Sequence, residues 1–120
     1  PLEAMKMIVS WAATDNHHEE EKVMMVNDVR RAYFDAKARR PIFIEIPPED
    51  KTTEDEKDDM VVELCLSMYG TRDAAQNWQQ TFSEHLTSIG FTKGLSNVCV
   101  FSHRGRGLKT MVHGHDYLTS

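Results

Sequence analysis

Residues 98–118, VCVFSHRGRGLKTMVHGHDYL, contain three apolar runs that are separated by two glycine-bearing turns. The runs at 98–101 and 109–112 predict two strands, which the turn Arg104-Gly-Arg-Gly107 joins. Gly114 and His115 predict a second tight turn that leads into a last strand. Because such short turns connect antiparallel neighbours, this stretch predicts an antiparallel sheet.

Two segments have the apolar spacing of amphipathic helices. Over residues 1–14, Pro1 suits a first helical turn, and Leu2, Met5, Val9 and Ala12 recur at helical spacing. A second helix is predicted to begin at a cap, Thr71 or Asp73, and to stop at Gly90. Its predicted buried face consists of Trp78, Phe82, Leu86 and Ile89.

Three more runs predict strands. Residues 23–29 form an almost continuous apolar run, consistent with a buried central strand. Residues 42–46 alternate and stop at Pro47-Pro48, and residues 61–66 return as a strand. The element order has no regular strand–helix–strand repeat. It therefore favours an α+β domain with helices packed on one face of an antiparallel sheet.

Length and charge limit the possible functions. The chain has 120 residues, about one small domain, and a net charge of -5, which argues against strong stand-alone nucleic-acid binding. Residues 49–59 predict a charged loop without core-forming residues. A basic cluster after residue 28 suits either a template backbone or triphosphate, or simply a solvated face. This cluster consists of Arg30, Arg31, Lys37, Arg39 and Arg40.

The two cysteines and the hydropathy bear on the cellular compartment. Cys65 and Cys99 lie in apolar runs and predict buried thiols, not a disulfide or a metal pair. Cysteines kept as free thiols indicate an intracellular protein, of the cytoplasm or nucleus. No run approaches the roughly 18 apolar residues of a membrane helix, and the N-terminus does not resemble a signal peptide.

Asp28 and Asp116 each lie at the end of an apolar, strand-like run. Two such acids are what a magnesium-dependent nucleotidyl-transfer site needs, because Mg²⁺ takes oxygen ligands and two ions can activate a hydroxyl and steady a leaving oxygen. By itself, an acid in this position is more often a cap or an edge charge.

In their order, the motifs of this chain resemble the palm of a copia-type (LTR) retrotransposon reverse transcriptase. Residues 28–34, DVRRAYF, resemble its first catalytic motif, an Asp-Val run with an aromatic five residues on, and residues 42–48, IFIEIPP, the extended stretch after it. Residues 67–78 resemble its Ser-Leu-Tyr-Gly stretch and Trp-bearing helix, and residues 89–91 the turn that follows. Residues 113–116, HGHD, fall where the family carries an aromatic, a small residue and two aspartates.

The resemblance implies a partial reverse transcriptase domain over residues 1–120, a palm with some fingers. Its implied chemistry is templated addition of deoxynucleotides to a primer 3′-hydroxyl with two Mg²⁺ ions, held by Asp28, Asp116 and the carbonyl of Val29. The implied partners are RNA or DNA template–primer, deoxynucleotide triphosphates, and the integrase and RNase H regions of the same polyprotein. Because the chain lacks an initiator methionine and ends soon after Asp116, we expect a polyprotein segment or a fragment of a decayed element.

The resemblance also implies residues that contact the nucleotide. Tyr33 would lie under the sugar and collide with a 2′-hydroxyl, although a half-buried aromatic is the plainer interpretation. Gly70 would let the backbone approach the ligand, and arginines would match phosphate in a bidentate fork. The residues assigned in this way are Val29, Arg30, Arg31, Tyr33, Tyr69, Gly70 and Arg72. Trp78 and Phe82 are assigned to the core.

Three positions depart from the family pattern. His115 stands at the first aspartate of the pair, His113 at the aromatic, and Ala75 at a proline of the middle motif. Imidazole offers one nitrogen and suits Zn, Cu, Fe or Ni better than Mg. Losing a carboxylate ligand removes charge from the metal site, so we expect the chain to be inactive or nearly so.

Two alternatives remain open. A zinc-dependent hydrolase would use His113, His115 and Asp116, with His17-His18 elsewhere, because residues i and i+2 of a strand point the same way. A non-catalytic relic, or a host-retained nucleic-acid-binding module, is the other alternative. In that case, strand edges left unpaired would promote aggregation.

Overall fold

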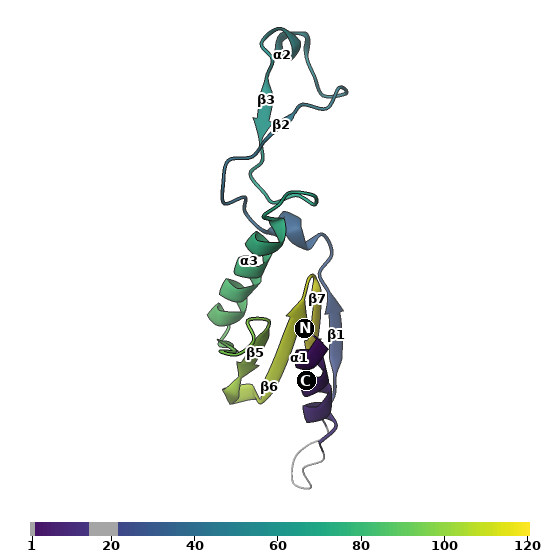
Figure 1. Ribbon diagram of the computed structural model, residues 1–120, viewed down its shortest axis with the longest axis vertical. Coiled ribbons are helices and arrows are strands. Elements are labelled where there is room, and N and C mark those ends of the chain that lie inside the picture. Colours follow the sequence, from purple (N-terminus) through teal and green to yellow (C-terminus); the bar gives the residue numbers. More distant parts are fainter. Residues whose placement is uncertain (1, 15–21) are drawn as a thin grey trace. The chain divides into compact units, whose positions relative to one another are not determined.

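The computed structural model describes residues 2–14 and 22–120. It divides into two compact units. We call Pro1–Ala32 with Phe82–Ser120 the sheet unit and Tyr33–Thr81 the hairpin unit. The described residues form three α-helices, a five-stranded antiparallel sheet and a two-stranded antiparallel sheet (Figure 1). The predicted α+β class is confirmed.

The five-stranded sheet has the order β1-β7-β6-β5-β4. Its strands are β1 (Met25–Asp28), β4 (Thr92–Lys93), β5 (Val100–His103), β6 (Leu108–His113) and β7 (Asp116–Thr119). The 3-10 turn η2 (Arg104–Arg106) joins β5 to β6, and the turn at 114–115 joins β6 to β7. Both predicted hairpins are thus confirmed, whereas the two-residue strand β4 was not predicted because it is too short to show a period.

The central strand β6 is covered on both faces. Met111 packs with Ala4 and Ile8 of α1 (Leu2–Ala12), which contacts β6 and β7 (Figure 1). Phe82 of α3 (Ala74–Ser88) instead meets Phe101 at a ring-centroid distance of 6.0 Å. In the β5–β6 register Phe101 is opposite Thr110, which is next to Met111 and so points to the other face. The helices therefore flank both faces, and the single-face packing that we expected does not describe this sheet.

Helix α1 is confirmed, but its buried face differs from the predicted one. Ala4 and Ile8 are buried, while Leu2, Met5 and Val9 are exposed. Farther along the buried side, Trp11 is half-buried, and the Nζ atoms of Lys22 and Lys109 lie 4.6 Å and 4.0 Å from its ring centroid. Apolar residues occupy much of the surface of this helix, so the sequence did not show which face is buried. Contact with β6 decides that the face with Ala4 and Ile8 is buried.

The run at 23–29 forms β1, but this strand is at an edge of the sheet and not at its centre. All four of its residues are exposed, and Val26 is 72% exposed. The apolar run suggested burial on both sides, whereas β7 is its one neighbour among the described strands.

In the hairpin unit, both predicted strands form, as β2 (Phe43–Glu45) and β3 (Val61–Glu63), and they pair antiparallel, which was not predicted. Between them, where we expected only a charged loop, a short helix α2 (Thr53–Lys57) forms. Its cause is a capping box: the Asp55 N–H donates to the Thr52 hydroxyl, and the Thr52 N–H donates to the Asp55 carboxylate. The Thr52 hydroxyl also donates to the Asp55 carboxylate, at 2.6 Å, and this bond, followed by the one from the Thr52 N–H, holds the pKa of Asp55 below its usual value.

Helix α3 begins and ends as predicted. The carbonyl of Asp73 accepts from the Asn77 N–H at 2.9 Å, which makes Asp73 the N-cap residue. Trp78, Phe82 and Leu86 are buried, but Ile89 follows the helix and is 50% exposed. Gly90 has a φ of 95°, and the Phe91 N–H donates to the Leu86 carbonyl at 3.0 Å, which closes a Schellman motif.

Both cysteines are free thiols. Cys65 is exposed, so the prediction of a buried thiol is wrong there, while Cys99 is half-buried. No helix among the described residues is long and apolar enough to cross a membrane.

Candidate active site

Strand pairing brings the two predicted aspartates together. In the β1–β7 register Asp28 lies directly opposite Asp116. Both residues are at the end of the sheet where the β6–β7 turn carries His115. Residues that are far apart in the sequence thus meet in one place because β1 pairs with the second strand of a hairpin.

Asp28, His115 and Asp116 form a group of three potential metal ligands. One ligand atom from each residue lies within 4.8 Å of the other two. His115 Nε2 is 3.5 Å from Asp28 Oδ1, and these side chains are 53% and 63% exposed. The group is therefore open to solvent.

The backbone holds the His115 turn against β1. The Val29 N–H donates to the His115 carbonyl at 2.9 Å, and Gly114 has a φ of 61° that favours glycine in this tight turn. For Val29, sequence reasoning had assigned its carbonyl as a metal ligand. The bond to His115 uses the Val29 N–H and not its carbonyl, so the role of the carbonyl stays a prediction.

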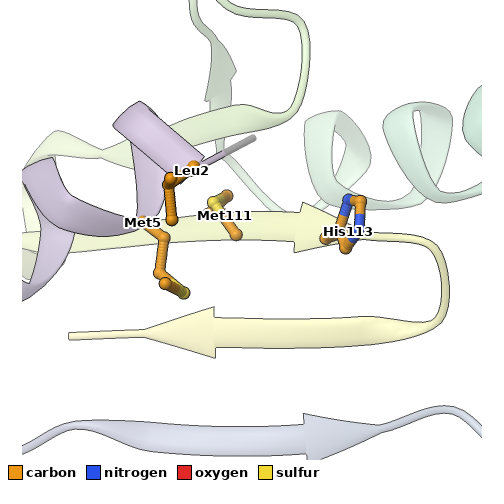
Figure 2. Close-up of a pocket in the computed structure, with 4 residues that line it drawn as sticks. All are labelled: Leu2, Met5, Met111 and His113. Atoms are coloured by element: carbon orange, nitrogen blue, oxygen red, sulfur yellow. The ribbon is translucent and has the colours of Figure 1, made fainter.

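His113 is outside this group of three. It pairs with Asp116 across β6 and β7, and its side chain lines an apolar pocket of about 350 Å³ with Leu2, Met5 and Met111. Figure 2 shows Leu2 and Met5 of α1 on one side of Met111 and His113 on the other side, near the end of β6. His17 and His18, named for the zinc alternative, lie outside the described residues.

Two aromatic rings of the hairpin unit pack against Tyr69, one of the predicted nucleotide contacts. Tyr33 stacks on it with ring centroids 4.4 Å apart and an interplanar angle of 28°. Phe34 meets Tyr69 edge-on at 5.6 Å, a contact that sequence reasoning did not anticipate. Gly70 follows with a φ of 90°, and Arg72 is exposed nearby in the sequence. Tyr69 and Phe34 are exposed, so the cluster presents aromatic surface to solvent.

A polar network supports this segment and was missed at the level of sequence. Asn77 Nδ2 donates to the Ser67 hydroxyl at 3.0 Å, and both residues are buried. Asn77 also donates to Asp73 at 3.3 Å, and Arg40 donates to the other oxygen of Asp73 at 3.1 Å. Burial raises the pKa of Asp73, but its own backbone N–H, Arg40 and Asn77 outweigh burial and lower it. The i, i+4 spacing of Asp73 and Asn77 was the available signal.

The basic residues of the cluster after Asp28 differ in their surroundings. Arg30 and Arg31 are exposed in the sheet unit, and Arg31 has a φ of 59°. Arg40 is instead paired with Asp73 within the hairpin unit. The predicted site residues thus fall into two sets, one in each unit. The sheet unit contains Asp28, Val29, Arg30, Arg31, His115 and Asp116. The hairpin unit contains Tyr33, Tyr69, Gly70 and Arg72.

A comparison with known protein families supports the resemblance that the motifs of this chain indicated. The sequence profile described as reverse transcriptase (RNA-dependent DNA polymerase) matches residues 1–115. The chain belongs to the reverse transcriptase family. No curated protein and no solved structure matches it. Membership in this polymerase family implies binding of a nucleic-acid template and use of metal ions in general.

The donor set of this reverse transcriptase domain does not fit a pair of Mg²⁺ ions. The gathered side chains are two carboxylates and one imidazole. Mg²⁺ demands near-octahedral oxygen coordination, and imidazole supplies a softer nitrogen without a negative charge.

Proposed function

We propose that this chain is a partial copia-type reverse transcriptase domain that has lost, or nearly lost, magnesium-dependent nucleotidyl transfer. The proposal is carried by one observation: His115 completes the group formed by Asp28 and Asp116, at the place where the resemblance expects a third carboxylate.

The physical reason is electrostatic. Two carboxylates bring a charge of about -2 to a site where three would bring about -3, and the added imidazole contributes no negative charge at neutral pH. Stabilisation of the transferring phosphoryl group depends on how firmly metal charge is held at that point. Loss of one carboxylate weakens the affinity for Mg²⁺ and its positioning at the same time.

For the remaining residues we propose the roles that the resemblance implies. Asp28 and Asp116 are the surviving acidic ligands, while Arg30, Arg31 and Arg72 contact phosphate. Tyr33 faces the nucleotide sugar, and its stacking on Tyr69 supports this role because a stacked ring is held firmly enough to exclude a 2′-hydroxyl. The proposed partners are template–primer, deoxynucleotide triphosphates, and the integrase and RNase H regions of one polyprotein.

The test compares the native chain with His115→Asp, each placed within an otherwise complete polymerase of this family. We expect the His115→Asp protein to extend a primer with Mg²⁺ about 10²–10³-fold faster or more, as when one strong stabilising group is restored. His115→Asn is the matched control, because it has the shape of aspartate without its charge, and it should stay as slow as the native protein. A native rate close to that of His115→Asp would contradict the proposal.

A further inference from the structure

We propose that Asp28, His115 and Asp116 form a site for a single borderline transition-metal ion, for which Zn²⁺ is the probe, in place of a pair of Mg²⁺ ions. This inference rests on the proposed function only in locating the site, and metal binding can be measured without any polymerase activity.

One donor separation matches that of a tetrahedral ion, within a group whose three ligand atoms all lie within 4.8 Å of one another. Zinc bonds to histidine nitrogen and carboxylate oxygen are about 2.0–2.2 Å long, so two ligands of a tetrahedral site lie about 3.3–3.5 Å apart. His115 Nε2 and Asp28 Oδ1 are 3.5 Å apart. Octahedral Mg²⁺, with bonds of about 2.0–2.1 Å, would need neighbouring ligands about 2.9 Å apart.

The chemistry of the donors points the same way. Imidazole nitrogen raises the affinity for Zn²⁺ far more than for Mg²⁺, which keeps its water and prefers oxygen. Two carboxylates neutralise the charge of one divalent ion. Three protein ligands leave a fourth position for water, and the exposure of the group keeps that position accessible.

The backbone places these donors close together before any ion binds. Asp28 and Asp116 are register partners in neighbouring strands, and the Val29 N–H anchors the carbonyl of His115. Ligands that already lie near their bound positions lose less conformational entropy when the ion binds. His113 serves as an internal comparison, since it lies two residues from His115 but lines the apolar pocket with Leu2, Met5 and Met111.

The experiment is a titration of the metal-free 120-residue chain with Zn²⁺ in competition with a chromophoric chelator. We expect one site that keeps its Zn²⁺ in a large excess of Mg²⁺. His115→Ala and Asp28→Asn should each weaken Zn²⁺ binding about 10-fold or more, because each removes a direct ligand. Replacement of Zn²⁺ by Co²⁺ should give the strong visible absorption of a tetrahedral site, which His115→Ala should abolish.

Two matched controls separate this site from other histidines. His113→Ala removes the imidazole two residues before His115 in the sequence. The double variant His17→Ala/His18→Ala removes two histidines that are consecutive in the sequence. Both should bind Zn²⁺ within about twofold of the native chain if the three-residue site is the binding site. The folding of every variant is checked by circular dichroism, and the exposed position of His115 makes its substitution compatible with the fold.

The proposal is overturned if His115→Ala binds Zn²⁺ as tightly as the native chain, or if the loss appears only in His113→Ala or in the His17/His18 double variant. These outcomes do not bear on the proposed loss of polymerase activity. Failure of His115→Asp to regain primer extension would contradict the proposed function, and it would not affect the result of the Zn²⁺ titration.

Discussion

The phenol of Tyr117 is half-buried in the sheet unit, where its ring meets Phe82 with centroids 6.2 Å apart. Burial raises the pKa of Tyr117 from 10.0 to about 12, because the phenolate would lose hydration. In the unfolded chain this group loses its proton near pH 10, while the folded chain keeps it until about pH 12. Between these values the unfolded state binds fewer protons, so the free energy of unfolding falls as pH rises.

Urea unfolding at several values between pH 9 and pH 12 measures this effect. Tyr117→Phe keeps the ring and removes the ionisable group, so we expect its free energy of unfolding to fall less steeply over this range. Equal slopes for the two proteins would show that the folded phenol ionises as readily as the unfolded one.

His115 and Cys65 show what residue identity alone can and cannot predict. The ligand chemistry of an imidazole is intrinsic, so the mismatch between His115 and Mg²⁺ could be predicted from the residue alone. Exposure is not intrinsic: Cys65 lies in an apolar run, yet it is exposed two residues after the end of β3, next to a two-stranded sheet in the chain. A two-stranded sheet is too thin to bury both of its faces.

Among the structural elements, the end of α3 depends on a single glycine. Gly90 has a φ of 95°, and a Cβ at this position would lie 2.8 Å from Nε2 of His103. Gly90→Ala therefore adds a steric clash to the strain of a left-handed residue, and we expect it to destabilise the sheet unit by at least about 2 kcal/mol.

Gly107→Ala is the matched control for this prediction. Gly107 also has a positive φ, of 64°, but no atom among the described residues lies within 4 Å of a Cβ built there. We expect only the conformational strain, about 1 kcal/mol. Urea unfolding monitored by tryptophan fluorescence compares the two variants. Equal losses would mean that His103 moves aside without cost.

The two long helices and the hairpins were predictable because their signals are local. Spacing, caps, glycine stops and short turns act within a few residues of each other. The face of α1 and the edge position of β1 were not predictable, because they depend on which strand packs beside them. Helix α2 was missed because its capping box, Thr52 and Asp55, lies within a run of charges that we interpreted as loop.

For the whole molecule, the edge strand β1 has consequences for association. Val26 is 72% exposed, Met24 and Met25 are exposed beside it, and β7 is the one described strand that pairs with β1. The opposite edge, β4, has two residues and ends in Lys93, a form that discourages pairing. We therefore expect the chain to self-associate through β1 as its concentration rises.

Val26→Lys tests this expectation, because a lysine on an edge strand opposes pairing with another chain. Sedimentation velocity over a range of concentrations should show a clear shift of this variant toward monomer. Leu95→Lys is the control: Leu95 is fully exposed but lies outside the strands, so its substitution should leave self-association unchanged. An equal effect of both substitutions would indicate general solubility instead of strand pairing.

The sequence by itself determined the two long helices, the two hairpins of residues 98–118, the α+β class and the chemical types of the candidate ligands, because each follows from local spacing or from side-chain chemistry. Only the tertiary structure decided that Asp28, His115 and Asp116 meet, that His113 is left out, and that Tyr33 stacks on Tyr69. The physical reason is that such encounters depend on strand register and packing between distant segments. A local pattern is compatible with many registers, and only the packing of the whole unit selects one of them.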